Sequence, residues 1–329
     1  SVTGVQTCAL PIYLPRAVAD GSTEPATFTL QPRRIIPVTG DPLENVRSNV
    51  HPIDVDGDGI FEVLQINGSR FLRMQRLNGT VLWSLRNPNG RVHRSEVHRD
   101  TVAVFDLDGD RRQEFVHCWV EPGTGVKELV LRRGDTGAVL RRYALTGDAA
   151  TSECQIAAFR VLERATPLIL VARQIQIPGV TCQRRFIDSW AVTQAFGTDL
   201  QPVWRRSTCD AGHYAWPLDE NGDGAAEAVF VGRYQLRPGG GLRCTLPGWG
   251  ADHVDTMLVT DLDPARSGHE VLAVGASGVR LYAAANCAPL PLSLPPEVAN
   301  IQHLNAARLD GLGAPAILMR VRNTDTEKV

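Results

Sequence analysis

Short apolar runs alternate with turns rich in aspartate, asparagine and glycine along most of the chain. The runs at 101–105 and 114–116, for example, flank the acidic turn 106–113, and both are rich in β-branched and aromatic residues. Such runs between turn residues predict β-hairpins. No segment carries a long apolar stripe with the 3.6-residue spacing of a helix. The pattern therefore predicts an all-β protein.

One acidic turn recurs at Asp54–Glu62, Asp106–Glu114 and Asp219–Glu227. Weaker copies begin at 160, 261 and 308, so six repeats start at 54, 106, 160, 219, 261 and 308, in steps of 52, 54, 59, 42 and 47 residues. Repeats of about 40 to 50 residues with about four short strands each are typical of propeller blades. We expect a β-propeller of four-stranded antiparallel blades with at least six repeats, hence six to eight blades.

Each full acidic turn can supply oxygen ligands from positions 1, 3, 5 and 9, with a backbone carbonyl at position 7. Calcium binds six to eight such hard oxygens, and close carboxylates repel one another unless a cation is present. The closing glutamate comes at position 9, whereas an EF-hand needs it at position 12 between two helices. The predicted calcium ligands are Asp54, Asp56, Asp58 and Glu62; Asp106, Asp108, Asp110 and Glu114; and Asp219, Asn221, Asp223 and Glu227.

These turns resemble the FG-GAP or VCBS repeats of integrin α-subunit propellers and of many secreted bacterial proteins. From Ser189 to Glu270 the order of tryptophans, histidines and acidic turns also resembles the propeller of family 11 rhamnogalacturonan lyases. The first resemblance implies a calcium-stabilised propeller that binds a carbohydrate or protein ligand. The second implies a lyase that cleaves a uronate polymer by β-elimination. Whether the protein is an enzyme stays open at this point.

Histidines recur before the strands that lead into the acidic turns. The segments 98–106 and 253–261 share the pattern His-x-Asp-Thr-x-x-Val-x-Asp, and His213 and His303 precede their own turns by six and five residues. If those strands are innermost, the histidines lie near the propeller axis, at the end opposite the calcium turns. A structural role for any single histidine is the competing interpretation. The candidate catalytic residues are His213, Tyr214, Arg233 and His253, and the candidate ligand-binding residues are His98, Asp100, Asp255 and His303.

Composition narrows the functional classes. The 329 residues are 43% hydrophobic and 21% charged, with a net charge of −2, and no basic cluster suggests nucleic acid. No apolar run has the length of a membrane span. The two resemblances imply a polysaccharide or a cell-surface protein as the partner, and hydrolase motifs such as Gly-x-Ser-x-Gly are absent.

Residues 1–13 resemble translated sequencing-adapter read-through, and we expect a single propeller domain over 14–329, incomplete at one or both ends. Apart from Cys8 there are six cysteines, which allow 15 pairings, so disulfides and buried free thiols both remain possible. An even set in a calcium-type propeller favours an oxidising compartment, extracellular or periplasmic.

Overall fold

The computed structural model describes two short strands at 12–14 and 26–28, most of the chain between 49 and 293, and strands at 301–307 and 316–321. Within 49–293 the description omits 68–69, 88–101, 146–153, 163, 165, 176–189, 209–211, 213–214, 251, 264–265 and 276. All elements in the described part are strands, and it contains no helix that could cross a membrane. The predicted all-β class is confirmed.

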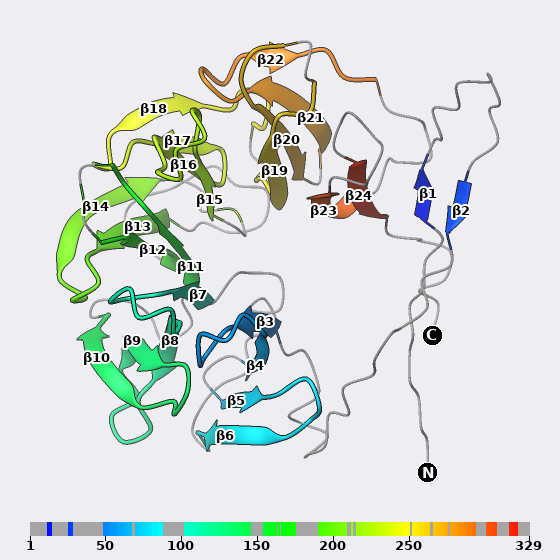
Figure 1. Ribbon diagram of the computed structural model, residues 1–329. Coiled ribbons are helices and arrows are strands. Elements are labelled where there is room, and N and C mark those ends of the chain that lie inside the picture. The colour runs from blue at the N-terminus through cyan, green and yellow to red at the C-terminus, as the bar shows by residue number, and fades with distance from the viewer. Residues whose placement is uncertain are drawn as a thin grey trace, which may run out of the picture.

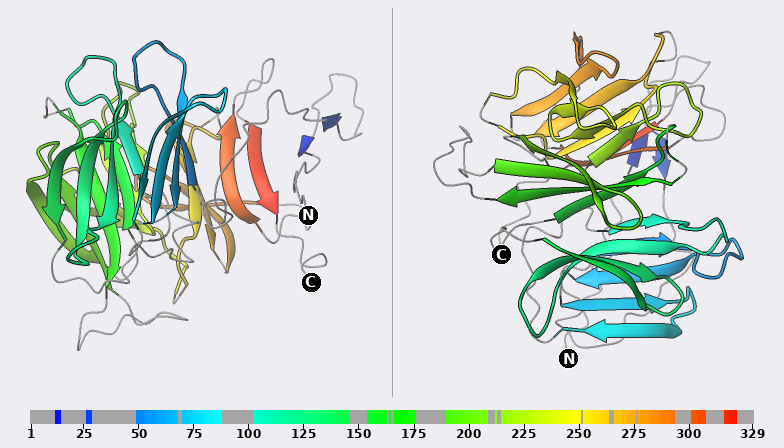
Figure 2. Two further views of the ribbon diagram at one scale, coloured as in Figure 1. Left: turned by 90° about the horizontal axis from the view of Figure 1, so that it is seen from below. Right: turned by 90° about the vertical axis from the view of Figure 1, so that its left-hand side faces the viewer.

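Five four-stranded antiparallel sheets stand around a common centre as the blades of a β-propeller (Figure 1). We number them in chain order: blade 1 holds β3–β6, blade 2 β7–β10, blade 3 β11–β14, blade 4 β15–β18 and blade 5 β19–β22. The strands β23 and β24 pair as the start of a sixth repeat, and β1 and β2 form a separate two-stranded sheet. Figure 2 shows the blades from two further directions.

The strand bounds of blades 1 to 3 are β3 Asn49–Ile53, β4 Glu62–Asn67, β5 Phe71–Gln75, β6 Val81–Arg86, β7 Val102–Phe105, β8 Glu114–Val120, β9 Lys127–Arg133, β10 Val139–Ala144, β11 Cys154–Phe159, β12 Leu168–Ile175, β13 Trp190–Phe196 and β14 Pro202–Thr208. Those of the remaining sheets are β15 Ala215–Leu218, β16 Ala228–Val231, β17 Tyr234–Leu236, β18 Leu242–Thr245, β19 Thr256–Thr260, β20 Glu270–Gly275, β21 Gly278–Ala283, β22 Pro289–Leu290, β23 Ile301–Ala307, β24 Ala316–Val321, β1 Ile12–Leu14 and β2 Ala26–Phe28.

The first strand of each sheet lies innermost. Strands β7, β11, β15, β19 and β23 are neighbours in that order around the centre, and β6, β10, β14, β18 and β22 lie at the outside (Figure 1). The predicted inner strands 101–105 and 256–260 correspond to β7 and β19. All six predicted repeat starts fall directly after an inner strand, between the first and second strands of their sheets.

The core lies between neighbouring blades, because side chains on the two faces of each strand alternate. Phe115 and Trp119 of β8 pack toward blade 1, whereas Val116 and Cys118 pack toward blade 3. Outer strands such as β10 are mostly exposed. Blades 2, 3 and 4 therefore bury both faces against their neighbours, which is why their inner and central strands are apolar on both sides.

Two disulfides join adjacent blades in the described part. Cys118 of β8 is bonded to Cys154 of β11, and Cys244 of β18 to Cys287 in the hairpin that follows β21. The first links blades 2 and 3, and the second links blades 4 and 5. Cys8, Cys182 and Cys209 lie outside the described residues.

Candidate functional site

The acidic turns of blades 1, 2 and 4 share one hydrogen-bond pattern. In blade 1, Asp54 at position 1 accepts the backbone N–H groups of Gly57 at 2.8 Å and Gly59 at 3.0 Å. The first aspartates of the other two turns, Asp106 and Asp219, accept the N–H groups of positions 4 and 6 in the same way. The sequence pattern thus defines one rigid loop conformation that occurs three times in the described residues.

The glutamate at position 9 closes each loop. Its Oε2 atom accepts the backbone N–H of position 2. The distances are 3.2 Å for Glu62 in blade 1, 3.0 Å for Glu114 in blade 2 and 2.7 Å for Glu227 in blade 4. Burial raises the pKa values of Glu62 and Glu114, and nearby aspartates raise them further, against the lowering effect of the backbone hydrogen bond. Negative charge on these two glutamates is therefore costly without a cation.

Three side chains in each loop bring oxygen atoms within 4.8 Å of one another. They are Asp54, Asp56 and Asp58 in blade 1, Asp106, Asp108 and Asp110 in blade 2, and Asp219, Asp223 and Glu227 in blade 4. The set fits a hard cation, because all of these ligand atoms are carboxylate oxygens. Asn221 lies in the third loop, where its side-chain amide donates to Asp223 at 3.1 Å.

Blades 3 and 5 have lost this acidic set. In blade 5, Glu270 still accepts the N–H of Leu262 at 2.8 Å, but Asp263 pairs with Arg266 at 2.9 Å. In blade 3, the exposed Arg160 stands at position 1, and its carbonyl accepts the N–H of Ala226 from blade 4. Of the shared hydrogen bonds, blade 5 thus keeps the one from its closing glutamate to position 2.

A second group of polar residues lies at the other end of the strands, in the loop from Leu246 to Asp255 that connects blades 4 and 5. His253 Nε2 lies 2.6 Å from Asp255 Oδ1, and the two side chains are 26% and 32% exposed. His253 Nδ1 lies 3.9 Å from Oδ1 of the buried Asp252, beyond hydrogen-bond distance. Asp252 accepts the backbone N–H groups of His253 and Ser277. The imidazole is thus oriented by one carboxylate and stands beside another.

Arg233 belongs to the same group. It lies in the turn between β16 and β17, and its Nη1 donates to the carbonyl of Gly250 at 2.9 Å, so it reaches the loop that carries His253. Its Nε contacts the hydroxyl of Tyr234 at 3.3 Å, and its guanidinium lies 5.4 Å from the centre of that ring. The structure therefore places two predicted catalytic residues, Arg233 and His253, at one end of the interface between blades 4 and 5.

Gly212 packs into the same region. A Cβ atom on this residue would lie 2.7 Å from Gly232 and 2.8 Å from the carbonyl oxygen of Val254. This close approach requires glycine. The predicted catalytic residues His213 and Tyr214 follow directly in sequence, but they lie outside the described residues.

The other predicted ligand-binding residues divide into three cases. His98 and Asp100 lie outside the described residues. His303 falls in β23, where only the backbone is described. Asp255 lies at the predicted end of its strand, with its carboxylate bonded to His253. A common pocket of histidines thus stays a prediction.

Sequence reasoning missed Asp252, whose only signal was its place next to His253. It also assigned no role to His117, which is fully buried in blade 2. His117 accepts a 2.9 Å hydrogen bond from Arg132, and burial and this arginine lower the pKa of the imidazole well below its usual value. His117 is a neutral residue of the core.

Comparison with known proteins shows a distant similarity to rhamnogalacturonan lyases. The chain is 24% identical over 277 residues to the rhamnogalacturonan exolyase YesX of Bacillus subtilis (strain 168), covering 70% of this chain and 44% of YesX. It is 23% identical to the rhamnogalacturonan endolyase YesW of the same organism, covering 80% of this chain and 51% of YesW. The chain thus spans about half the length of these relatives.

Solved structures show the same fold. The rhamnogalacturonan lyase PL11 of Bacillus licheniformis matches with a TM-score of 0.60 at 19% identity, over 83% of this chain and 55% of the enzyme. The structure of YesX matches with a TM-score of 0.58 at 20% identity, over 83% of this chain and 53% of the enzyme. No family model matches the chain, so the resemblance to FG-GAP or VCBS repeats stays a prediction.

Proposed function

We propose that this chain is the propeller part of a polysaccharide lyase that cleaves a rhamnogalacturonan-like uronate polymer by β-elimination. The similarity to two rhamnogalacturonan lyases supports this reading over a propeller that only binds a ligand. The observation that carries it in the structure is the placement of a histidine–carboxylate pair and an arginine at one end of the interface between blades 4 and 5.

His253 is the proposed general base. The carboxylate of Asp255 lies 2.6 Å from Nε2 and orients the imidazole, and Nδ1 is the atom proposed to take the proton. Oδ1 of the neighbouring Asp252 lies 3.9 Å from Nδ1, and both Asp252 oxygens accept backbone N–H groups. A positioned base of this kind contributes about 10² to 10⁴ in rate.

Arg233 is the proposed partner of the uronate carboxylate. Removal of the proton α to a carboxylate moves negative charge onto that group, and a fixed cation stabilises this charge in the transition state. The hydrogen bond to Gly250 fixes one side of the guanidinium, and its remaining N–H groups are donors that can pair with a carboxylate.

The reaction needs no redox partner. The base takes the proton from the carbon next to the carboxylate, the electron pair forms the new carbon–carbon double bond, and the bond to the 4-linked sugar oxygen breaks. That oxygen leaves with a proton from an acid, for which Tyr214 is a candidate by its sequence position. The products are an unsaturated uronate and a new free chain end.

We also propose that the three acidic loops bind calcium as a structural ion. The support is the clustering of carboxylate oxygens within 4.8 Å and the raised pKa values of Glu62 and Glu114. The proposed compartment is extracellular or periplasmic, supported by the two disulfides between blades, since such bonds persist under oxidising conditions.

The test is incubation of the purified chain with rhamnogalacturonan and with a neutral polysaccharide as control. The expected result is ultraviolet absorbance of unsaturated uronate from rhamnogalacturonan alone, which His253→Ala abolishes while the circular dichroism spectrum stays unchanged. Binding without product would instead support a ligand-binding propeller. The absence of both binding and product would contradict the proposal.

A further inference from the structure

Blades 1 to 4 each contact the following blade through the third residue of their outermost strand. These residues, which we call the bridging residues, are Trp83 in β6, Arg141 in β10, Trp204 in β14 and Cys244 in β18. Two are tryptophans, and the other two, an arginine and a cysteine, differ from them in size and chemistry. The shared position shows that the fold, and not the residue type, directs them to the neighbouring blade.

The receiving blade offers the same two features at all four interfaces, both in the hairpin between its third and fourth strands. The first is a carbonyl oxygen, which accepts an N–H from the preceding blade: Gly134 from Trp83 (2.8 Å), Thr198 from Arg141 (3.4 Å), Pro238 from Trp204, and Ala284 from Gln235 (2.7 Å). The second is a residue with positive φ: Gly137, Leu200, Gly240 and Cys287.

At two interfaces an indole ring lies on the glycine of positive φ. A Cβ atom on Gly137 would lie 2.9 Å from the ring of Trp83, and one on Gly240 would lie 2.7 Å from the ring of Trp204. Glycine is required there both by its φ and by the ring. These interfaces, between blades 1 and 2 and between blades 3 and 4, are closed by contacts that do not depend on oxidation state.

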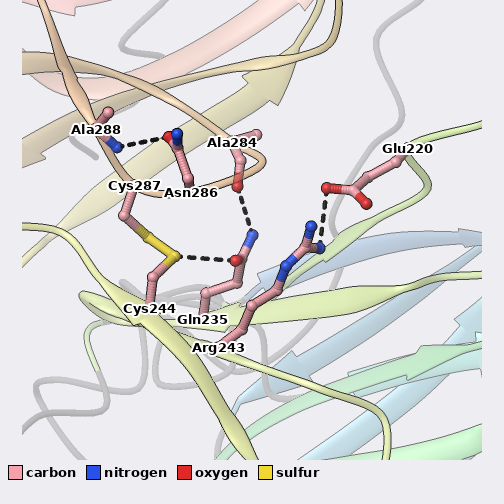
Figure 3. The surroundings of a disulfide bond; sticks show 8 residues. All are labelled: Glu220, Gln235, Arg243, Cys244, Ala284, Asn286, Cys287 and Ala288. Atoms are coloured by element: carbon pink, nitrogen blue, oxygen red, sulfur yellow. Dashed lines mark hydrogen bonds and ion pairs between the residues drawn. A yellow bond between two sulfur atoms is a disulfide. The ribbon is translucent and has the colours of Figure 1, made fainter.

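At the interface between blades 4 and 5, two residues make the two contacts that a single tryptophan makes between blades 1 and 2 and between blades 3 and 4. Gln235 Nε2 donates to the carbonyl of Ala284, as the indole N–H does elsewhere, and Cys244 is bonded to Cys287 at the positive-φ position (Figure 3). Gln235 pairs with Cys244 in the sheet, where Met74 pairs with Trp83. The disulfide thus lies where the indole ring lies at the interfaces between blades 1 and 2 and between blades 3 and 4.

The loop of His253 begins directly after this bridge. Its first residue, Leu246, is two positions after Cys244, and its N–H donates to the carbonyl of Arg233. Tyr282 of blade 5 donates its hydroxyl to the carbonyl of Pro247 at 2.7 Å. The outer edge of the loop is therefore held between blades 4 and 5 close to the disulfide.

We propose that the Cys244–Cys287 disulfide is a redox-dependent closure of the interface between blades 4 and 5, and that its reduction releases the loop 246–255. A small dithiol supplies two electrons and two protons, yields the thiols of Cys244 and Cys287, and is itself oxidised to a disulfide. Two thiols fill much less of the interface than an indole ring, so the reduced interface keeps the Gln235 hydrogen bond but loses its bridging contact.

The test is hydrogen exchange of the full chain, with and without dithiothreitol, read at residues 246–255. In the wild type we expect exchange there to rise at least about tenfold after complete reduction, verified by thiol titration. The triple variant C244W/Q235M/C287G copies the residues of the interface between blades 1 and 2, and its exchange in this loop is expected not to respond to dithiothreitol.

Two further variants test which of the two described disulfides controls hydrogen exchange in the loop 246–255. C118S/C154S removes the other described disulfide, which does not lie at a bridging position, and should keep the response of the loop 246–255. C244S/C287S should show the exchange of the reduced wild type without any reductant, which also provides a measurement if the triple variant does not fold. Unchanged exchange in the fully reduced wild type would overturn the proposal. Because exchange needs no substrate, this outcome is separate from the test of lyase activity.

Discussion

The indole ring of Trp83 in blade 1 lies directly on Gly137 in blade 2, and its Nε1 donates to the carbonyl of Gly134 in the same hairpin. A single contact thus combines a hydrogen bond, a partly buried ring and a backbone conformation that favours glycine. The same combination recurs with Trp204 and Gly240 between blades 3 and 4.

The first prediction concerns this contact. Gly137→Ala should lower the free energy of unfolding by about 2–4 kcal/mol, the sum of the strain of an L-residue at positive φ and the clash with the ring. The control is Gly125→Ala. Gly125 has φ 68°, against 69° for Gly137, but a Cβ atom there meets nothing within 4 Å, so its loss should be only about 1 kcal/mol. Equal losses in urea unfolding would contradict the role of the ring.

The second prediction concerns Arg111, which has φ 72° at position 6 of its acidic loop, where Gly59 and Gly224 stand in the other two. Arg111→Gly should raise the free energy of unfolding by about 0.5–1 kcal/mol, since it removes the strain of a side chain at positive φ. The neighbouring Arg112 has no such φ, so Arg112→Gly should be destabilising. Destabilisation by both substitutions would show that Arg111 is not strained.

The third prediction concerns calcium. Removal of calcium with EGTA should lower the melting temperature, because an ion that binds only the folded state stabilises it. Asp108→Asn in blade 2 should weaken this response, whereas Asp263→Asn in blade 5 should leave it unchanged, because Asp263 pairs with Arg266. An identical melting curve with EGTA, and no bound calcium by metal analysis, would rule out the structural ion.

The fourth prediction concerns pH. Burial lowers the pKa of His51 to about 4, so the folded state keeps this imidazole neutral while the unfolded chain binds a proton below about pH 6.5. The free energy of unfolding therefore falls as the pH falls through this window, by about 2 kcal/mol between pH 7 and pH 5 for this residue. His51→Leu should remove that part of the pH dependence, measured by urea unfolding at both values. If the free energy of unfolding of His51→Leu fell with pH as steeply as that of the wild type, the prediction would be wrong.

The fifth prediction concerns Asp255 as a positioning residue. Asp255→Asn should lower kcat on rhamnogalacturonan by about tenfold or more with little change in KM, and should shift the acidic limb of the pH profile, because the amide no longer stabilises the charged imidazole. Asp135→Asn removes a carboxylate that pairs with Arg133 on blade 2 and should change neither quantity. A loss in Asp255→Asn without any shift of the pH profile would indicate a structural role only.

The repeat pattern was predictable because each acidic loop is defined locally. The aspartate at position 1 and the residues at positions 4 and 6 lie within a few residues of one another, and their hydrogen bonds are short-range. The weaker repeat of blade 5, predicted to start at 261, also falls directly after its inner strand, and its Glu270 accepts the N–H of Leu262. The inner strands follow from the same loops, since each loop directly succeeds one.

Contacts between blades were not predictable in this way. Trp83, Arg141, Trp204 and Cys244 share a structural position but not one residue type, and their partners lie in the next repeat. Cysteine spacing alone left 15 pairings open. The match between 98–106 and 253–261 pointed to His253 and Asp255 separately, but that their side chains meet depends on the path of the loop between blades 4 and 5.

The two disulfides have a further consequence for the order of events during synthesis. They join residues 36 and 43 positions apart, close to the length of one repeat, so each ring of covalently closed chain contains only adjacent blades. Closure of a short ring needs little loop entropy, and both partners have left the ribosome before the next blade is complete. The chain can therefore be oxidised stepwise from its N-terminal side, without waiting for the whole circle of blades to assemble.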